Sequence, residues 1–190
     1  MLTEPRHSVL IALGSNVGDR LLNLRRAVDA LGGILRVVRV SGVWESAPVD
    51  APRGSGAFLN MVVAGWAAAP PRELLGRMHR IEEEMGRVRR RKNEPRVIDL
   101  DLILHGASLA RDASLVLPHP RYRERGFVLD PLRELRLPWV DPSTTVPLAR
   151  IRADGGGVRV GRLYEGPARS VGATESRRRR RTRPSGPRAL

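Results

Sequence analysis

The sequence predicts one domain in which β-strands and α-helices alternate. Two apolar runs, residues 8–13 and 58–64, have the length and composition of buried strands. Residues 98–104, IDLDLIL, alternate acidic and apolar side chains, as a strand does when its two faces meet different surroundings. Apolar residues recur at helical spacing between these strands. At 190 residues the chain is long enough for one domain with a sizeable core.

The first helix is predicted to follow a turn-rich stretch, residues 14–19, and to end at the Gly-Gly pair of residues 32–33. Its apolar face comprises Leu21, Leu24, Val28 and Leu31. We expect residues 34–44 to form a second strand that pairs with residues 58–64.

The second helix is predicted to open at the Pro-Pro pair of residues 70–71, where proline is tolerated, and to end at Gly86. Its core face comprises Leu74, Met78, Ile81 and Met85. Residues 106–116 are typical of a hairpin return and residues 128–135 of a short helix. Weak signals nearer the C-terminus predict a hairpin around residues 154–157.

Composition excludes several kinds of site. The chain has no Cys, which excludes a disulfide framework and a thiolate metal site. Its only lysine is Lys92, so the glycine turn at residues 14–19 has no P-loop lysine and a Walker-type nucleotide site is excluded. No apolar run approaches the length of a membrane span, and the N-terminus lacks the pattern of a secretory signal. We therefore expect a soluble, cytoplasmic protein.

The net charge of +14 is unevenly distributed. Residues 169–190 hold eight Arg and one Glu, a balance of +7, and have almost nothing apolar to bury. We expect this stretch to be a disordered basic tail. Such a tail could bind nucleic acid through non-specific electrostatics, but a solvated tail without a dedicated partner is the favoured interpretation.

Asp99 and Asp101 are the first candidate site residues, because their carboxylates should share one strand face, with Leu100, Leu102 and Leu104 on the other. Two anions so placed repel each other and are costly to bury unpaired. Six cationic residues crowd the approach to this strand: Arg87, Arg89, Arg90, Arg91, Lys92 and Arg96. This arrangement suggests a Mg²⁺ ion bound with a polyphosphate, because Mg²⁺ prefers carboxylate oxygens. Simple ion pairing between the acids and the arginines explains the same residues equally well.

Asn60 and His79 each admit two interpretations. Asn60 shares an otherwise apolar strand face with Phe58, where a buried amide needs hydrogen-bond partners. Backbone groups are the usual partners, and the edge of a planar ligand is the alternative. His79 lies at helical spacing between Leu75 and Glu82, where an ordinary boundary histidine is expected more often than a ligand.

Six short segments stand out when the chain is taken as a whole. They are LGSNVGDR near the start, ESAPVD, FLN, IEEEMGRVR, PRVIDLDLIL, and LPHPRYRERGF followed by VLDPL. In content, order and spacing this set resembles the 6-hydroxymethyl-7,8-dihydropterin pyrophosphokinase family over roughly residues 8–140. A lone DxD pattern is short and common, whereas six ordered motifs are specific.

The resemblance implies an α+β, ferredoxin-like fold over residues 1–168, with a mostly antiparallel sheet and helices packed against it. It implies Mg²⁺-dependent transfer of pyrophosphate from ATP to the hydroxymethyl group of 6-hydroxymethyl-7,8-dihydropterin, with release of AMP, in folate biosynthesis. We expect a monomer whose partners are these two substrates, with any nucleic-acid binding confined to the tail.

By position, the resemblance assigns Asp99 and Asp101 to two Mg²⁺ ions and makes Arg87 and Arg96 catalytic with them. The residues expected to contact ATP are Leu75, His79, Glu82, Arg87, Arg89, Arg96, Leu102, His119 and Arg125. The residues expected to contact the pterin are Gly14, Ser46, Ala47, Pro48, Val49, Phe58, Asn60 and Phe127. The two aromatic rings would enclose the flat heterocycle.

The chain departs from the family pattern in two places. Asn93-Glu94-Pro95-Arg96 stands where many members have aromatic-Gly-Pro-Arg, so the loop aromatic that helps to seal the pterin is absent. Phe58 replaces a tyrosine of some members, which keeps the ring and loses a hydroxyl.

Two rival functions fit parts of the sequence. Ferredoxin-like sheets also occur in RNA-binding modules, but those need aromatic residues along the strands, and only 4% of this chain is aromatic. A ligand-binding domain without activity would need the loss of a key residue, and none of the expected residues is missing.

Overall fold

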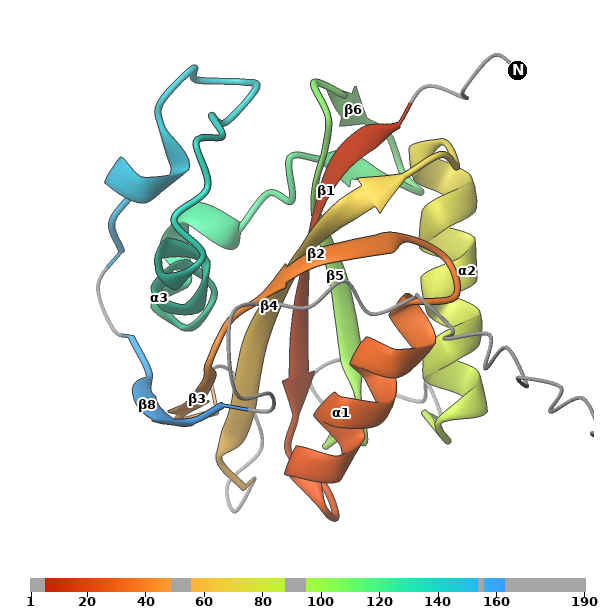
Figure 1. Ribbon diagram of the computed structural model, residues 1–190, viewed down its shortest axis with the longest axis vertical. Helices are drawn as coiled ribbons and strands as arrows, with labels where there is room; N and C mark the ends of the chain where they lie inside the picture. The colour runs from red at the N-terminus through yellow and green to blue at the C-terminus, as the bar shows by residue number, and fades with distance from the viewer. Residues whose placement is uncertain (1–5, 49–55, 88–94, 154–155, 163–190) are drawn as a thin grey trace, which may run out of the picture.

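The computed structural model describes residues 6–48, 56–87, 95–153 and 156–162. A six-stranded antiparallel sheet lies at its centre, with α1 (Arg20–Leu31) and α2 (Pro71–Glu84) on one face and α3 (Gly126–Glu134) on the other (Figure 1). The strands of this sheet are β1 (His7–Ser15), β2 (Arg36–Val40), β3 (Val43–Ser46), β4 (Phe58–Ala67), β5 (Asp99–His105) and β8 (Val158–Gly161).

The strand order is β5-β1-β4-β3-β8, and β2 pairs with β4 beside β3. Because β1 and β5 each neighbour strands that are distant in sequence, the chain follows the βαββαβ plan of ferredoxin-like domains. The α+β, ferredoxin-like prediction is therefore confirmed. A small hairpin of β6 (Ala110–Arg111) and β7 (Val116–Leu117) and two 3₁₀ turns, η1 (Tyr122–Glu124) and η2 (Leu148–Arg150), complete the described elements.

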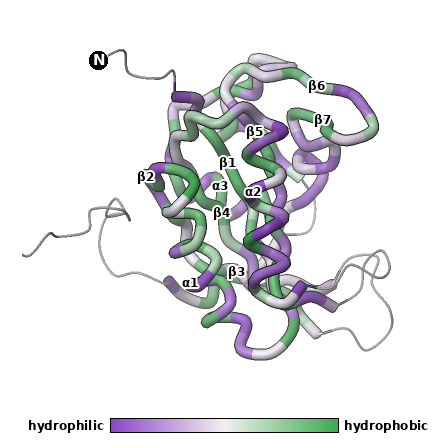
Figure 2. Tube along the Cα trace, turned by 90° about the vertical axis from the view of Figure 1, so that its right-hand side faces the viewer, coloured by the Kyte–Doolittle hydropathy of each residue, from purple (hydrophilic) through white to green (hydrophobic). Residues whose placement is uncertain are grey.

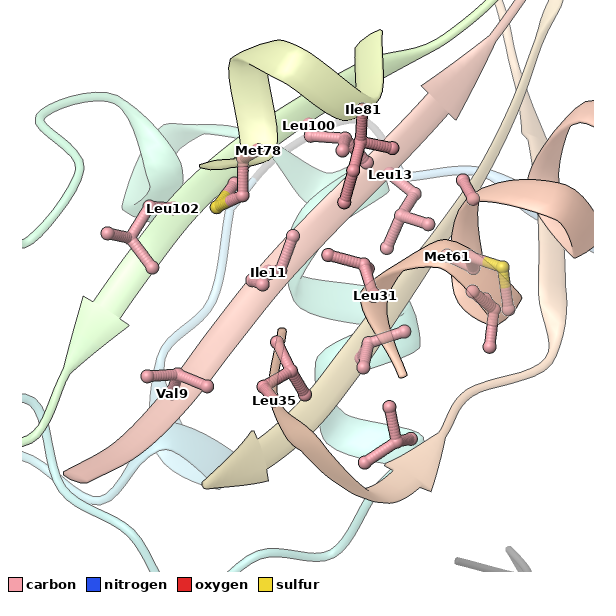
Figure 3. Close-up of a cluster of buried hydrophobic side chains, with 14 of the residues drawn as sticks. Val9, Ile11, Leu13, Leu31, Leu35, Met61, Met78, Ile81, Leu100 and Leu102 are labelled. Carbon is pink, nitrogen blue, oxygen red and sulfur yellow. The ribbon is translucent and has the colours of Figure 1, made fainter. Parts of the chain in front are cut away.

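Each face of the sheet has its own apolar core. Val9, Ile11 and Leu13 of β1 pack towards α1 and α2, as Figure 3 shows. The alternate residues of the same strand, Leu10 and Ala12, pack towards α3. Because β1 is covered on both faces it is hydrophobic throughout, and Figure 2 shows it and β4 as mostly hydrophobic beside hydrophilic stretches of α2. None of the helices within the described residues is long and apolar enough to cross a bilayer.

The prediction of one continuous strand over residues 34–44 is wrong, because the chain breaks between β2 and β3 at Ser41 and Gly42. The Ser41 hydroxyl accepts the backbone N–H of Val62 at 2.9 Å, in the place of a backbone carbonyl. The N–H of Gly42 turns away and donates to the Glu134 carboxylate at 2.9 Å. Local side-chain acceptors of this kind compete with a regular ladder.

The acidic strand also departs from simple alternation. Leu10 pairs with Leu104 and Ile11 with Leu102, so Ile103 is the extra residue of a β-bulge. Leu100 and Leu102 share one face as predicted, and this face packs towards α2, but beyond the bulge Leu104 joins the α3 core with Ile103. The prediction that Leu104 shares the face of Leu100 is therefore wrong.

Two smaller predictions are also wrong. Leu21 is 47% exposed and takes no part in the core face of α1. The polar residue Asn23 is buried on this helix, and its amide donates to the Ser15 hydroxyl and to the backbone oxygen of Val17. Within the described residues, β8 pairs with β3 rather than forming a hairpin around residues 154–157. Leu74, Met78 and Ile81 of α2 are buried as predicted, and Met85 is partly buried against the same core. The predicted short helix is present as α3 and begins at Gly126. The basic tail lies outside the described residues.

Asp141 fastens the segment that leads into α3. Its side chain is fully buried and accepts hydrogen bonds from the Tyr122 hydroxyl at 2.6 Å, from Arg123 Nε at 2.6 Å and from the N–H of Ser143 at 2.8 Å. Burial alone would raise the pKa of Asp141, but these hydrogen bonds outweigh burial and lower it from 3.8 to about 2.

This network predicts an acid-dependent loss of stability. Because the folded pKa of Asp141 lies below its ordinary value, its contribution is complete above about pH 4 and is lost as pH falls towards about pH 2. The full contribution is of the order of 2 kcal/mol. We expect Asp141→Asn to unfold more easily at neutral pH and to differ less from wild type at about pH 2, as measured by urea titration. An unchanged difference between the two proteins across this range would contradict the assignment.

Gly65 predicts a second stability effect, because β2 crosses β4 closely there. A Cβ at Gly65 would lie 2.6 Å from the backbone oxygen of Arg36 and 2.5 Å from a methyl group of Leu35. Gly65→Ala should therefore lower the unfolding free energy by about 1–3 kcal/mol. Gly76, within α2, has open space around its Cβ position. Gly76→Ala is the matched control and should raise stability by up to about 1 kcal/mol in the same denaturant titration.

Candidate active site

A row of four residues crosses the α3-facing side of the sheet and defines the site. In the strand register Asp99 on β5 lies opposite Gly14 on β1, Gly14 lies opposite Asn60 on β4, and Asn60 lies opposite Trp44 on β3. Residues directly opposite in antiparallel strands point to the same face. Because Gly14 has no side chain, it leaves room between the Asp99 carboxylate and the Asn60 amide.

The adjacent row repeats this pattern with Asp101, Ala12 and Val62. The prediction that Asp99 and Asp101 share one strand face is confirmed, since Leu100 and Leu102 between and beyond them lie in the opposite core. The small side chain of Ala12 continues the floor beside Gly14.

Three arginines face the two carboxylates. Arg87 donates to Asp99 Oδ1 at 2.5 Å, and Arg96 donates to Asp99 Oδ2 at 2.8 Å. Arg125, just before α3, donates to Asp101 at 3.3 Å. The acids are therefore paired with arginines, as the ion-pairing interpretation expects. Asp101 has only the longer contact, at 3.3 Å from Arg125.

The electrostatics of Asp101 follow from this unequal pairing. Burial and then the charge of Asp99 raise its pKa from 3.8 to about 6, against the opposing effect of Arg125. A carboxylate held in this way gains from a further cation. Within the part of the chain that the structure describes, no group of three or more acidic or histidine side chains could hold a metal ion. A hard cation at the Asp99–Asp101 pair would therefore complete its coordination with ligand oxygens and water, which is the usual arrangement for Mg²⁺ with phosphates.

Glu82 has a structural role that its position on the helix edge did not reveal. It is 1% exposed, accepts the backbone N–H of Leu100 at 2.7 Å and forms an ion pair with Arg87. It therefore ties the outer edge of β5 to α2 and holds the arginine that reaches Asp99.

His119 lies beside the same cluster. Burial and then the positive charge of Arg125 lower its pKa from 6.5 to about 4, so the ring is neutral at physiological pH. Its Nδ1 accepts the backbone N–H of Arg121 at 3.3 Å. The proton of the neutral ring then belongs on Nε2, which leaves Nε2–H as a donor for an anionic ligand.

The other residues expected to contact ATP follow the edge where α2 borders β5. Leu75 and His79 are half-buried there. The Leu102 side chain is buried in the core, so only its backbone can face a ligand. Because the N–H of Leu100 points outward to Glu82, that of Leu102, two residues on, points outward as well. Arg89 lies outside the described residues.

Asn60 and Ser46, two of the residues expected to contact the pterin, lie towards the Trp44 end of the Asp99–Trp44 row. The Asn60 amide donates to Ser46 Oγ at 2.9 Å and to the backbone oxygen of Trp44 at 3.4 Å. A side-chain hydroxyl and a backbone carbonyl therefore satisfy the donor side of this amide, so its partners are only partly the backbone groups that are usual for a buried amide. Ala47 is exposed, Pro48 is half-buried and Val49 lies outside the described residues.

Each of the two predicted aromatic residues lies near a site arginine. The guanidinium carbon of Arg96 is 5.9 Å from the centre of the Phe58 ring, and that of Arg125 is 5.7 Å from the centre of the Phe127 ring. Both distances suit a cation–π contact. Two of the three arginines that face the carboxylates, Arg96 and Arg125, thus also face the rings.

The sheet order and the arginine-faced carboxylate pair define a ferredoxin-like α+β domain with a cationic site on one face of its sheet. Residues 10–137 match the family described as 7,8-dihydro-6-hydroxymethylpterin-pyrophosphokinase (HPPK). The chain belongs to this family.

Relatives from bacteria and plants agree with this assignment. A 2-amino-4-hydroxy-6-hydroxymethyldihydropteridine pyrophosphokinase of Aquifex aeolicus is 34% identical over 147 residues, which cover 77% of this chain and 91% of the relative. A mitochondrial folate synthesis bifunctional protein of Arabidopsis thaliana is 40% identical over 157 residues, or 80% of this chain. The chain spans only 27% of the Arabidopsis protein.

Solved structures support the fold. The chain is similar to Plasmodium falciparum HPPK-DHPS, crystallised with pterin and p-hydroxybenzoate, with a TM-score of 0.59 and 13% sequence identity. The similarity covers 78% of this chain and 42% of that protein.

The raised pKa of Asp101 predicts a stability effect that is separate from activity. The neutral form stabilises the fold fully below about pH 4, and this contribution is lost as pH rises through about 6. Asp101→Asn removes the titration and keeps an oxygen for Arg125. We expect the metal-free variant to be more stable than wild type at about pH 8 and equally stable at about pH 4, as measured by urea unfolding. A wild type as stable as the variant at the higher pH would refute the assignment.

Proposed function

We propose that this protein transfers pyrophosphate from ATP to the hydroxymethyl group of 6-hydroxymethyl-7,8-dihydropterin and releases AMP. The observation that carries the proposal is the row from Asp99 across Gly14 to Asn60, which joins a carboxylate–arginine cluster to an amide on one sheet face. Family membership and the naming of the relatives support the same reaction.

The phosphate half of the proposed complex uses the cationic cluster. Arg87, Arg96 and Arg125, with the neutral His119, would bind the phosphate oxygens and hold the β-phosphorus in line with the attacking hydroxyl. Phosphoryl transfer depends mainly on such positioning and charge stabilisation. The oxygen–phosphorus bond to the pterin forms as the bond between the β-phosphorus and the α-phosphate oxygen breaks.

Mg²⁺ is the cofactor that the donor set fits, with Asp99 and Asp101 as its protein ligands. When bound, it would neutralise charge on the triphosphate and lower the barrier by polarising the phosphoryl oxygens. Arg87, Arg96 and Arg125 pair with the same carboxylates, so they would exchange these partners for phosphate oxygens when the substrate complex forms.

The pterin half of the proposed complex uses Asn60 and the two rings. Phe58 and Phe127 would pack against the flat faces of the heterocycle, and Asn60 would bind its edge with Ser46 beside it. Gly14 would leave the space in which the hydroxymethyl group approaches Asp99. A monomeric state and a cytoplasmic location stay predictions.

A coupled assay tests the reaction. Purified protein mixed with ATP, Mg²⁺ and the pterin should release AMP only when all three are present, as measured by nucleotide chromatography with one omission for each component. AMP release that does not require the pterin would contradict the proposal, and so would a folded protein that releases none.

Substitution of the acidic pair tests the metal assignment. Asp99→Ala and Asp101→Ala should each lower the transfer rate at least about a hundredfold while the fold is retained, because each removes a metal ligand. Asp112→Ala is the matched control, since Asp112 pairs with Arg72 near the β6–β7 hairpin, away from the site. An undiminished rate in Asp101→Ala would exclude Asp101 as a ligand.

A further inference from the structure

Asn16, in the turn after β1, holds the backbone of Arg96 from two sides. Its Oδ1 accepts the backbone N–H of Arg96 at 2.7 Å, and its own N–H donates to the backbone oxygen of Arg96 at 3.2 Å. Its Nδ2 reaches the backbone oxygen of Gly56 at 3.5 Å. Asn16 therefore links the end of β1, the approach to β4 and the approach to β5.

The contact matters because of what precedes Arg96. Pro95 has no N–H and cannot donate a backbone hydrogen bond. The N–H of Arg96 is therefore the first backbone donor after the proline, and its bond to Asn16 anchors the chain just before β5. A backbone N–H is also an obligatory donor, and an amide oxygen at this position satisfies it.

The side chain of Arg96 is held for binding. One terminal nitrogen donates to Asp99, and the guanidinium lies over the Phe58 ring. Its Nε–H is buried and has no hydrogen-bond partner among the described residues. Arg96 thus lies between the carboxylate half and the aromatic half of the site with one donor unfilled.

We propose that Asn16 is a positioning residue, which sets Arg96 so that its free Nε–H meets an acceptor on the bound substrates. The inference rests on the proposed function and adds a residue of the first glycine turn to the machinery of transfer. Asn16 itself acts through Arg96. An ångström of misplacement at such a group can cost about a hundredfold in rate.

Steady-state kinetics on five variants test the proposal. Asn16→Ala should lower kcat by about ten- to a hundredfold, with a smaller change in the KM for ATP. Asn16→Asp, which keeps an oxygen for the Arg96 N–H, should recover most of this loss. In an Arg96→Ala background, Asn16→Ala should have almost no further effect, because the guanidinium that it positions is gone. Asp19→Ala removes the N-cap of α1 from the same turn, and should lower the melting temperature with kcat unchanged.

A spectroscopic readout removes the dependence on turnover. The ¹⁵N–¹H signal of Arg96 Nε, assigned by its loss in Arg96→Lys, should be protected from solvent exchange in wild type and exposed to it in Asn16→Ala. Should Asn16→Ala fail to fold, Asn16→Gln, which displaces the amide by one methylene, replaces it in both experiments.

The outcomes separate this inference from the proposed function. A wild-type protein without AMP release overturns both. If the wild type is active and Asn16→Ala is equally active, only the role of Asn16 is overturned. The same holds if the double variant loses kcat by the product of the losses of Asn16→Ala and Arg96→Ala, because the two residues would then act independently. The role of Asn16 is supported if Asn16→Ala lowers kcat, if Asn16→Asp recovers most of it, and if Asn16→Ala has no further effect in the Arg96→Ala background.

Discussion

The repulsion between Asp99 and Asp101 is the constraint around which the site is organised. Two carboxylates on one face of an edge strand cannot both be buried without positive charge nearby. The chain supplies that charge from three places, with Arg87 after α2, Arg96 three residues before Asp99 and Arg125 before α3. The pairs made by Arg87 and Arg125 therefore form only when α2 and α3 have packed on the sheet. The distribution is unequal, and Asp101 retains a raised pKa that favours a further cation.

The sheet meets this constraint through register and residue size. Gly14 and Ala12 lie beside the two acids, so neither β1 side chain fills the space above them. The bulge at Ile103 then changes which face the end of β5 presents, and Leu104 joins the α3 core instead of the α2 core. The first half of β5 thus places Asp99 and Asp101 in the site, and its second half places Ile103 and Leu104 in the α3 core. Strict alternation would not place Ile103 and Leu104 in the same core.

Much of this fold could be predicted from local patterns, because the continuous apolar runs of β1 and β4 and the helical periodicity of α2 report burial directly. The bulge and the break at Ser41 could not, since each depends on a partner across the sheet that no local window contains. The site divides in the same way. The motifs identify Asp99 and Asn60, but their register across Gly14 appears only in the fold. Asn16 lies in the LGSNVGDR motif, but its hydrogen bond from Arg96 joins residues 80 apart in sequence, and nothing in that motif indicates Arg96 as the partner.

The two halves of the proposed complex meet at two arginine–aromatic pairs. Arg96 lies over Phe58 and faces Asp99, while Arg125 lies near Phe127 and faces Asp101. A flat heterocycle between the rings would replace part of each cation–π contact, and phosphate oxygens would replace the carboxylate partners of the same arginines. Either substrate would therefore change the balance of forces on the groups that bind the other. Coupling between the sites would need no distant conformational change, because it would follow from two side chains that each belong to both halves.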